Sequence, residues 1–230
     1  MSTQQQWKAF CRKVVRAGAD LAVPLCCGGC DSPGIGWCPR CAAVLADSPE
    51  QVTTRVPVPA PAWACARYRG PARRAVIAAK DHGRTDLAAP LGDALAHALR
   101  TLARWGELPD VTLLQLVPAP TRATSARRRG GDPVTAMART AASRLGPRVR
   151  VTPALFTAAW TADSAGLSAP ERARNLSGRV RLRRDAHLHP RAVTVLIDDV
   201  ITTGTTAAES ARVLAAHGIH LDAVLVIAAA

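Results

Sequence analysis

Two adjacent carboxylates, Asp198 and Asp199, end a β-branched run that begins at residue 193. Threonines and one glycine follow at residues 202–206, where a helical pattern begins. Carboxylates accept hydrogen bonds from the vicinal hydroxyls of a sugar, while threonine hydroxyls and the first backbone amides of a helix donate to a phosphate. The segment therefore predicts a sugar-phosphate site rather than an ordinary strand–turn–helix in which Asp and Thr only cap the helix. The expected phosphate-binding residues are Thr202, Thr203, Gly204, Thr205 and Thr206.

An arginine cluster follows the apolar run 113–117, at Arg122 and residues 127–129. Guanidinium groups match phosphate oxygens with two parallel hydrogen bonds, which suits a pyrophosphate group. Such a cluster alone is usually a solvated loop, but parallel strands end at one edge of a sheet, so we expect it beside Asp198.

Four cysteines, Cys27, Cys30, Cys38 and Cys41, form two pairs with two residues between the members of each pair. That spacing allows both sulfurs of a turn to face one ion, and four thiolates are a typical zinc ligand set. The gap of seven residues between the pairs is shorter than the usual zinc-ribbon spacing. The adjacent Cys26 could replace Cys27 as a ligand. The pattern predicts a structural zinc site in preference to a group of buried free thiols.

The formal net charge is +13, and it is concentrated in two segments. Residues 120–150 hold eight arginines against one acid, and residues 172–191 hold seven against one acid, which together account for the whole excess. Such clustering favours either a polyanionic small-molecule ligand or a nucleic acid. An arginine-rich composition explains why only three basic residues are lysines, but it does not explain the clustering. Aromatic residues make up only 3%, which disfavours recognition by base stacking.

Composition and hydropathy indicate a globular chain without a membrane span. Hydrophobic residues make up 48% and charged residues 20% of the 230 residues, which suits one α/β domain with a small appendage. No apolar run approaches the roughly 18 residues needed to cross a bilayer, so we expect no membrane insertion. Charged residues interrupt every candidate signal-peptide core, namely Lys8, Arg12, Lys13, Arg16 and Asp20. The expected location is therefore cytoplasmic.

Short β-prone runs alternate with helical patterns along most of the chain. Expected strands cover residues 63–68, 113–117, 193–197 and 221–227. Expected helices cover residues 5–23, 71–80, 87–105, 133–145 and 205–217. Alternation of this kind predicts an α/β fold in which helices flank a parallel sheet. We expect an N-terminal helix and zinc knuckle at 1–50, a Pro-rich linker at 51–62 and the α/β domain at 63–230.

The order Asp-Asp followed by Thr-Thr-Gly-x-Thr resembles the phosphoribosyl pyrophosphate (PRPP) signature of the type I phosphoribosyltransferases. The resemblance implies a type I phosphoribosyltransferase-like sheet in which Asp198 and Asp199 hold the ribose 2′- and 3′-hydroxyls. It also implies that residues 202–206 bind the 5′-phosphate and that magnesium accompanies PRPP. With Arg122, the two carboxylates would form the catalytic group.

Further motifs follow one another along the chain. They are the four-cysteine knuckle, Tyr68-Arg69-Gly70, a helix ending in Lys80, Val117-Pro-Ala-Pro120, Arg129-Gly130, Arg172-x-x-Asn175-Leu176 and the Asp-Asp loop. From about residue 24 to residue 230, this order looks like the ComF/ComFC competence-associated family of phosphoribosyltransferase-like proteins. The resemblance implies that Lys80 and Arg172 also contact PRPP. Family members commonly carry Asn-Gln where this chain has Gly131-Asp132.

Three functions compete for these features. The leading expectation is a phosphoribosyltransferase that binds PRPP with magnesium and transfers the phosphoribosyl group to an unidentified acceptor. The family resemblance links this activity to DNA uptake and natural transformation. The alternative is a non-enzymatic adaptor, whose zinc head and arginine segments would hold single-stranded DNA or a DNA-processing protein. An isolated zinc module on an inert α/β body would leave the Asp-Asp loop unexplained.

Overall fold

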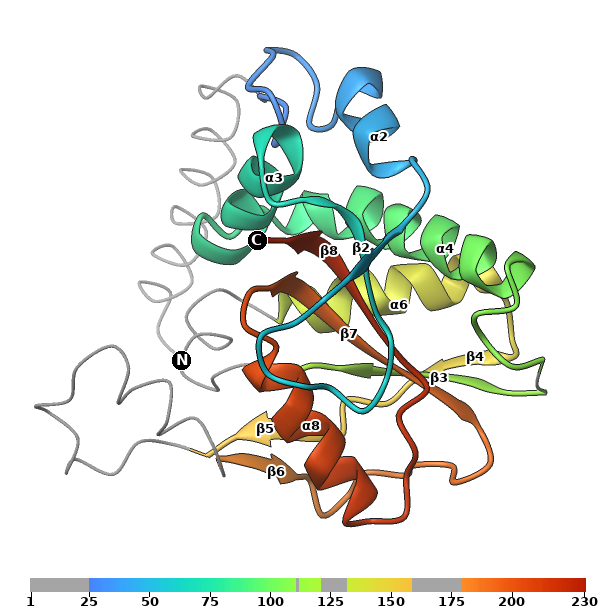
Figure 1. Cartoon of the computed structure of the whole chain (residues 1–230). Helices are drawn as coiled ribbons and strands as arrows, with labels where there is room; N and C mark the ends of the chain where they lie inside the picture. The colour runs from blue at the N-terminus through green and yellow to red at the C-terminus, as the bar shows by residue number, and fades with distance from the viewer. Residues whose placement is uncertain (1–24, 111, 121–131, 159–178) are drawn as a thin grey trace, which may run out of the picture.

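The computed structural model describes residues 25–110, 112–120, 132–158 and 179–230 of the chain (Figure 1). The helix expected at 5–23 lies outside the described residues, as do the segments that carry Arg122, the arginines 127–129 and Arg172. None of the helices within the described ranges is long and apolar enough to cross a membrane.

A six-stranded sheet forms the centre of the fold, with strand order β1-β2-β8-β7-β3-β4. Only β1 and β2 pair antiparallel, and the other neighbouring strands of this sheet are parallel. Its strands are β1 Glu50–Val52, β2 Ala62–Arg67, β3 Leu114–Pro118, β4 Val149–Val151, β7 Val193–Ile201 and β8 Ala223–Ala229. The α/β class and the mostly parallel sheet are therefore confirmed.

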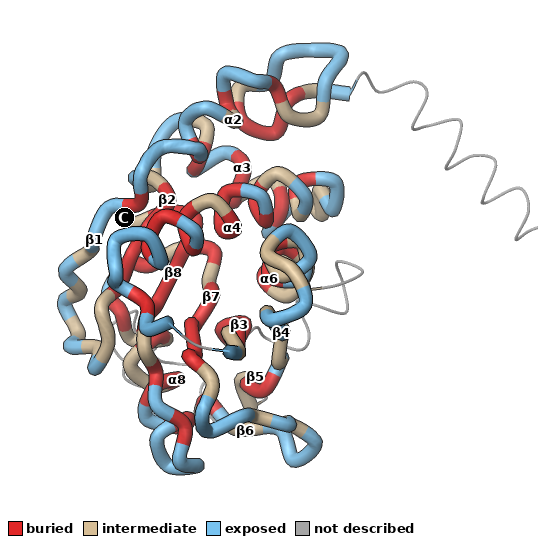
Figure 2. The backbone as a smooth tube through the Cα atoms, turned by 90° about the vertical axis from the view of Figure 1, so that its right-hand side faces the viewer, coloured by how far each residue is buried: buried red, intermediate tan, exposed pale blue. Residues whose placement is uncertain are grey.

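Helices cover both faces of this sheet (Figure 1). One face packs against α3 Gly70–Asp81, α4 Ala88–Arg104 and α6 Pro133–Leu145, in a core that includes Val195 and Ile197 of β7. The opposite face packs against α8 Thr205–Ala215, in a second core that includes Leu196. Because successive side chains of a strand point to opposite faces, β7 supplies both cores in alternation. Figure 2 shows the buried residues concentrated in these central strands.

The register of the central strands brings their carboxyl ends to one edge. Ile197 of β7 lies opposite Pro118 of β3 and Leu225 of β8, and Asp198 lies opposite Val226. The pairing of β7 with β8 continues to Ile201. The strand expected at 193–197 therefore extends four residues further, because β8 offers partners along that whole length. Ligands of open α/β sheets bind at this edge, so the acidic pair lies where a site is expected.

Helix α6 begins and ends where the sequence predicts, at residues 133 and 145. Asp132 precedes it, and its carboxylate accepts hydrogen bonds from the amides of Val134 at 3.2 Å and Thr135 at 3.3 Å. Proline follows at the first helical position, which suits its fixed φ and missing N–H. Asp132 thus serves as a helix cap.

Several short elements have no counterpart in the sequence analysis. They are β1, β4, helix α2 Pro39–Leu45, the 3₁₀ turn Thr85–Leu87, and the antiparallel pair of β5 Leu155–Thr157 with β6 Val180–Leu182. Most of these are only three residues long, which is too short for a two-residue or a 3.6-residue period to be recognised.

Residues 50–62 contain β1 and a proline-rich stretch that packs on the sheet. Val58 and Ala60 lie against the core under α8, and Val56 donates a backbone hydrogen bond to Thr203 at 2.8 Å. The sequence analysis assigned this stretch to a linker, and the division of the chain at residues 50 and 62 stays a prediction.

Candidate functional site

The loop between β7 and α8 depends on a glycine. Gly204 has φ +86° and is the residue before the first turn of α8. A Cβ atom at this position would lie 2.7 Å from Cβ of Thr54 and 3.0 Å from the carbonyl oxygen of Val56. Both the left-handed backbone and the close approach of residues 54–56 therefore require glycine.

Hydroxyl groups gather on this loop. Thr203 and Thr205 place their Oγ1 atoms 2.9 Å apart, and the amide of Thr205 lies 3.4 Å from Oγ1 of Thr203. All five residues of the 202–206 segment line one small pocket, together with the carboxylate-bearing Asp198. The first amides of α8 have no acceptor within the helix, so the pocket combines hydroxyl donors with a helix N-terminus. It is suited chemically to an anion.

Residues 54–56 brace this loop from outside. The hydroxyl of Thr54 donates to the carbonyl of Val56 at 2.7 Å, which bends the backbone at Arg55. The amide of Val56 is then free to donate to Thr203. The sequence analysis missed this brace, because no local pattern reveals that the segment before β2 crosses the end of β7.

The two carboxylates of the Asp-Asp pair lie in different surroundings. Asp198 follows Leu196 on the α8 side of β7 and lines the pocket. Asp199 lies on the other side, where its carboxylate accepts from Nζ of Lys80 at 2.8 Å and 3.2 Å. Lys80 belongs to the last turn of α3, so this ion pair ties α3 to the end of β7.

The surroundings of Asp198 and Lys80 shift the pKa values of both groups. Burial, reinforced by the negative charge of Asp199, raises the pKa of Asp198 to about 8. Burial opposes the charge of Lys80, but the nearby Asp199 carboxylate outweighs it and raises the pKa of this ammonium. Burial and the neighbouring carboxylate therefore disfavour the charge of Asp198, and a cation bound beside it would favour the ionised form.

A second site lies in the N-terminal head, where four thiols converge. The Sγ atoms of Cys27, Cys30, Cys38 and Cys41 all lie within 4.8 Å of one another. In a tetrahedral zinc site with bonds of about 2.3 Å, neighbouring sulfurs are about 3.8 Å apart. The Cys30 and Cys38 sulfurs are already 3.6 Å apart. The cluster can hold a metal such as zinc, and Cys27 rather than Cys26 belongs to it.

Tight turns aim these sulfurs inward. The amide of Cys38 donates to Sγ of Cys27 at 3.3 Å, and the amide of Cys27 donates to the carbonyl of Ser32 at 2.8 Å. A Cβ atom on Gly29 would lie 2.7 Å from Sγ of Cys41, so the first knuckle has no room for a side chain there. Amide donors to sulfur are typical of thiolate sites, since they stabilise the anion.

Ionisation differs among the four thiols. A hydrogen bond from the Ser32 hydroxyl is the main reason that the pKa of Cys30 falls to about 6. Burial opposes ionisation of Cys27, but amide donors, including Gly29, outweigh it and lower its pKa. Burial raises the pKa of Cys41. The head therefore presents thiolate character before any cation binds, which favours capture of a soft divalent ion.

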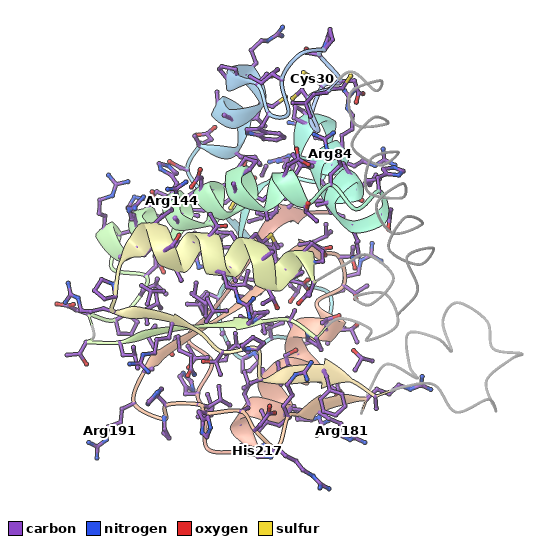
Figure 3. The ribbon with its side chains drawn as sticks, turned by 180° about the vertical axis from the view of Figure 1, so that it is seen from behind. Cys30, Arg84, Arg144, Arg181, Arg191 and His217 are labelled. Carbon is purple, nitrogen blue, oxygen red and sulfur yellow. The ribbon has the colours of Figure 1, made fainter. Side chains whose placement is uncertain are left out.

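Arg84 fixes the head to the body of the protein. Its guanidinium donates to the carbonyl oxygen of Cys26 at 3.0 Å and of Gly36 at 3.4 Å. The same group binds Asp86 through two hydrogen bonds of 2.7 Å and 2.8 Å. Figure 3 shows Arg84 close to the head, near Cys30. Sequence reasoning missed this contact, because nothing local distinguishes Arg84 from the many other arginines.

The second arginine segment is described from Arg179 onward, and Figure 3 labels its members Arg181 and Arg191 toward the end of the molecule opposite the head. Its exposed members in the described part of the chain are Arg181, Arg183, Arg184 and Arg191. The guanidinium of Arg183 lies 5.8 Å from the centre of the Phe156 ring. These residues present positive charge to solvent.

The structure brings together Asp198 with the 202–206 loop, Asp199 with Lys80, and the four predicted cysteines with one another. Arg122 and Arg172 lie outside the described residues, so their places beside the loop stay predictions. No protein-family model and no curated protein matches the chain. We therefore infer function from the residues and geometry of these sites.

Proposed function

We propose that this chain is a phosphoribosyltransferase that binds PRPP and magnesium at residues 198–206. The observation that carries the proposal is the shared pocket of Asp198 and the 202–206 loop, at the carboxyl edge of a parallel sheet. There, a carboxylate that can accept hydrogen bonds from sugar hydroxyls lies beside a loop that can bind a phosphate, as a ribose 5-phosphate group requires.

Each residue then has a chemical role. The loop hydroxyls and the amides at the start of α8 bind the 5′-phosphate, and Asp198 accepts hydrogen bonds from ribose hydroxyls. The family resemblance implies the same role for Asp199, although Asp198 is the carboxylate that lines the pocket. Lys80 supplies a cation beside the strand end, and we predict that Arg122 and Arg172 supply two more.

The reaction class follows from these charges. The bond from C1′ to the diphosphate oxygen breaks with its electron pair leaving on diphosphate, and a nucleophilic atom of the acceptor forms the new bond to C1′. Cations placed before the reaction stabilise the negative charge that grows on the leaving group, and this electrostatic effect is usually the largest in such catalysis. Lys80 and Arg122 would serve that purpose.

Magnesium fits the oxygen-rich lining of the pocket, because a carboxylate and hydroxyls are the ligands that this ion prefers. Asp198 would hold it together with phosphate oxygens of PRPP. When bound, the ion would neutralise charge on the diphosphate group.

For the head, we propose structural zinc at Cys27, Cys30, Cys38 and Cys41. Four protein ligands fill a tetrahedral site completely and leave no open position for chemistry. The motif order that resembles the ComF/ComFC family further suggests a role in DNA uptake and natural transformation, in the cytoplasm.

A specific observation also favours a second candidate function, an adaptor that binds single-stranded DNA or a DNA-processing protein. The exposed arginines 181, 183, 184 and 191 do not line the pocket of the loop, so PRPP bound in that pocket would leave them open to another anion. A basic surface of this kind binds phosphate backbones without reading sequence.

Calorimetric titration with PRPP, in the presence and absence of Mg²⁺, tests the proposed function. The wild-type chain should bind PRPP only with Mg²⁺, and Asp198→Ala combined with Asp199→Ala should abolish the heat of binding. Asp185→Asn, at an exposed position beyond β6, is the matched control for a lost carboxylate. Equal binding by all three proteins would place the ligand elsewhere.

A further inference from the structure

The ion pair of Lys80 and Asp199 is the feature of the site that a ribose-binding role leaves unexplained. The Asp199 side chain is 11% exposed, whereas the Lys80 side chain is 49% exposed. Its ammonium lies 2.8 Å and 3.2 Å from the two carboxylate oxygens, so both oxygens of Asp199 already have a partner. The carboxylate keeps further lone pairs, but Asp199 does not line the pocket and is therefore poorly placed for ribose hydroxyls.

The pleat of β7 keeps the two carboxylates apart. Val195, Ile197 and then Asp199 follow one another on the face that packs against α3, α4 and α6. Leu196 and then Asp198 continue the other row, which leads into the pocket. A rotation of one side chain does not bring Asp199 through the backbone to the pocket side.

We propose that Asp199 is the resting counter-ion of Lys80, and that Lys80 exchanges this carboxylate for the diphosphate group of PRPP when substrate binds. The inference rests on the proposed function, and it makes Lys80 the binding residue and Asp199 its positioning residue. It assigns the ribose contact to Asp198 alone.

Physical differences between the partners support this direction of exchange. Asp199 is nearly buried and short, so it stays in place, while the half-exposed ammonium stands on a flexible four-carbon stem. A diphosphate carries more negative charge than one carboxylate and offers more acceptor oxygens. It can therefore compete for the three ammonium donors at the solvent-facing side of the pair.

If Asp199 only competes with diphosphate for Lys80, replacing Asp199 should strengthen diphosphate binding. If Asp199 is a ribose ligand, the same change should weaken binding of ribose 5-phosphate. Asp199→Asn removes the competitor for Lys80, so inorganic diphosphate should bind about three- to tenfold more tightly. Ribose 5-phosphate should bind Asp199→Asn within about twofold of wild type, because the variant leaves the pocket face unchanged. Asp198→Ala should weaken ribose 5-phosphate binding about tenfold or more, because it removes the proposed hydroxyl acceptor.

The experiment is a set of calorimetric titrations of the full chain with ribose 5-phosphate and with inorganic diphosphate, both with Mg²⁺. Lys80→Met should lose about tenfold or more in diphosphate affinity, and the double variant Lys80→Met/Asp199→Asn should show no gain over Lys80→Met. Lys80→Arg should keep most of the affinity, because it retains the charge. Asp185→Asn reports the effect of net charge alone, and the melting temperature of each variant reports folding.

The outcomes separate the two ideas. Weaker binding of either ligand by a folded Asp199→Asn, or wild-type diphosphate affinity in Lys80→Met, would overturn the exchange and leave the proposed function standing. Should Asp199→Asn not fold, the contrast of Lys80→Arg with Lys80→Met decides in the same way. A wild-type chain that binds diphosphate but not ribose 5-phosphate would overturn the phosphoribosyl function. Binding of neither ligand would overturn both.

Discussion

At the scale of residues, Asp198 and Asp199 are neighbours in sequence whose carboxylates meet opposite faces of β7. Lys80 neutralises Asp199, while burial and the charge of Asp199 favour the protonated form of Asp198. A carboxyl group whose pKa is strongly raised, next to a carboxylate held in an ion pair, is a common feature of functional sites.

This difference has a consequence for stability. Asp198 has a pKa of about 8 in the folded chain, against about 4 in an unfolded chain. The folded state holds a proton that the unfolded state has released, so stability should fall as pH rises from about 4 to about 8. Asp198→Asn removes this loss. Without PRPP and Mg²⁺, we expect it to raise the melting temperature by about 2–5 °C near pH 8.5 and little near pH 4.5.

Scanning calorimetry of both proteins across this pH range measures the effect. Asp185→Asn, which replaces an exposed carboxylate, should show no such pH-dependent difference. A difference between Asp198→Asn and wild type that stays constant with pH would contradict the raised pKa.

Gly204 gives a second residue-scale prediction. Gly204→Ala should lower the free energy of unfolding by about 1–3 kcal/mol, because alanine would have φ +86° and its Cβ would approach Thr54. Gly218 has φ +74° and open space around the missing Cβ, so Gly218→Ala is a matched control for backbone strain alone. Denaturant unfolding should show the larger loss for Gly204→Ala. Equal losses would mean that residues 54–56 do not constrain the loop.

At the scale of elements, local signals predicted those helices and strands that are long and clearly bounded. Asp132 and Pro133 mark the start of α6 by their residue types, and the β-branched run at 193–197 marks β7. Asp198 and Asp199 point to opposite faces of the sheet because side chains alternate along a strand. This follows from the sequence once β7 is known to continue to Ile201. The brace at Thr54 and the contact of Arg84 with the head join residues distant in sequence, so no local pattern reveals them.

Arg84, between α3 and α4, leads to a prediction about the zinc affinity of the head. Arg84→Lys loses the planar fork that binds Asp86 and the carbonyls of Cys26 and Gly36, so we expect zinc affinity to fall about tenfold. Competition with a chelator measures this affinity, starting from about one zinc per wild-type chain. Arg212→Lys is the control, because the Arg212 guanidinium also donates two hydrogen bonds to a carboxylate, that of Glu209 on α8, far from the head in sequence. Purified wild-type protein without zinc or iron would contradict the assignment of the head.

At the scale of the whole molecule, the parts that we assign to different ligands occupy separate regions. In Figure 3 the cysteine head lies at one end of the molecule, and Arg181 and Arg191 lie toward the other end. The loop between β7 and α8 ends the sheet on a third side, beside α3 (Figure 1). Separate regions can bind separate anions, so PRPP binding and phosphate-backbone binding are distinguishable by mutation.

We therefore predict weak, sequence-independent binding of single-stranded oligonucleotides that falls steeply with salt. Neutralising Arg181, Arg183 and Arg184 together should reduce the slope of log affinity against log salt by about two to three units, and PRPP affinity should stay nearly unchanged. Fluorescence titration across a salt series measures the slope. Neutralising the exposed Arg40, Arg100 and Arg148, on other elements, controls for net charge. An equal loss of PRPP and oligonucleotide in the first variant would mean that one site binds both.

The central claim is that the 202–206 loop receives the 5′-phosphate of PRPP, and a thermal shift of Thr203→Glu tests it most directly. PRPP with Mg²⁺ should raise the melting temperature of the wild-type chain, because the ligand binds the folded state alone. Thr203→Glu places a carboxylate beside the Thr205 hydroxyl, where the phosphate belongs, and should abolish the shift. Ser143→Glu, an exposed change of the same charge on α6, should keep it. A shift of wild-type size in Thr203→Glu would contradict the claim.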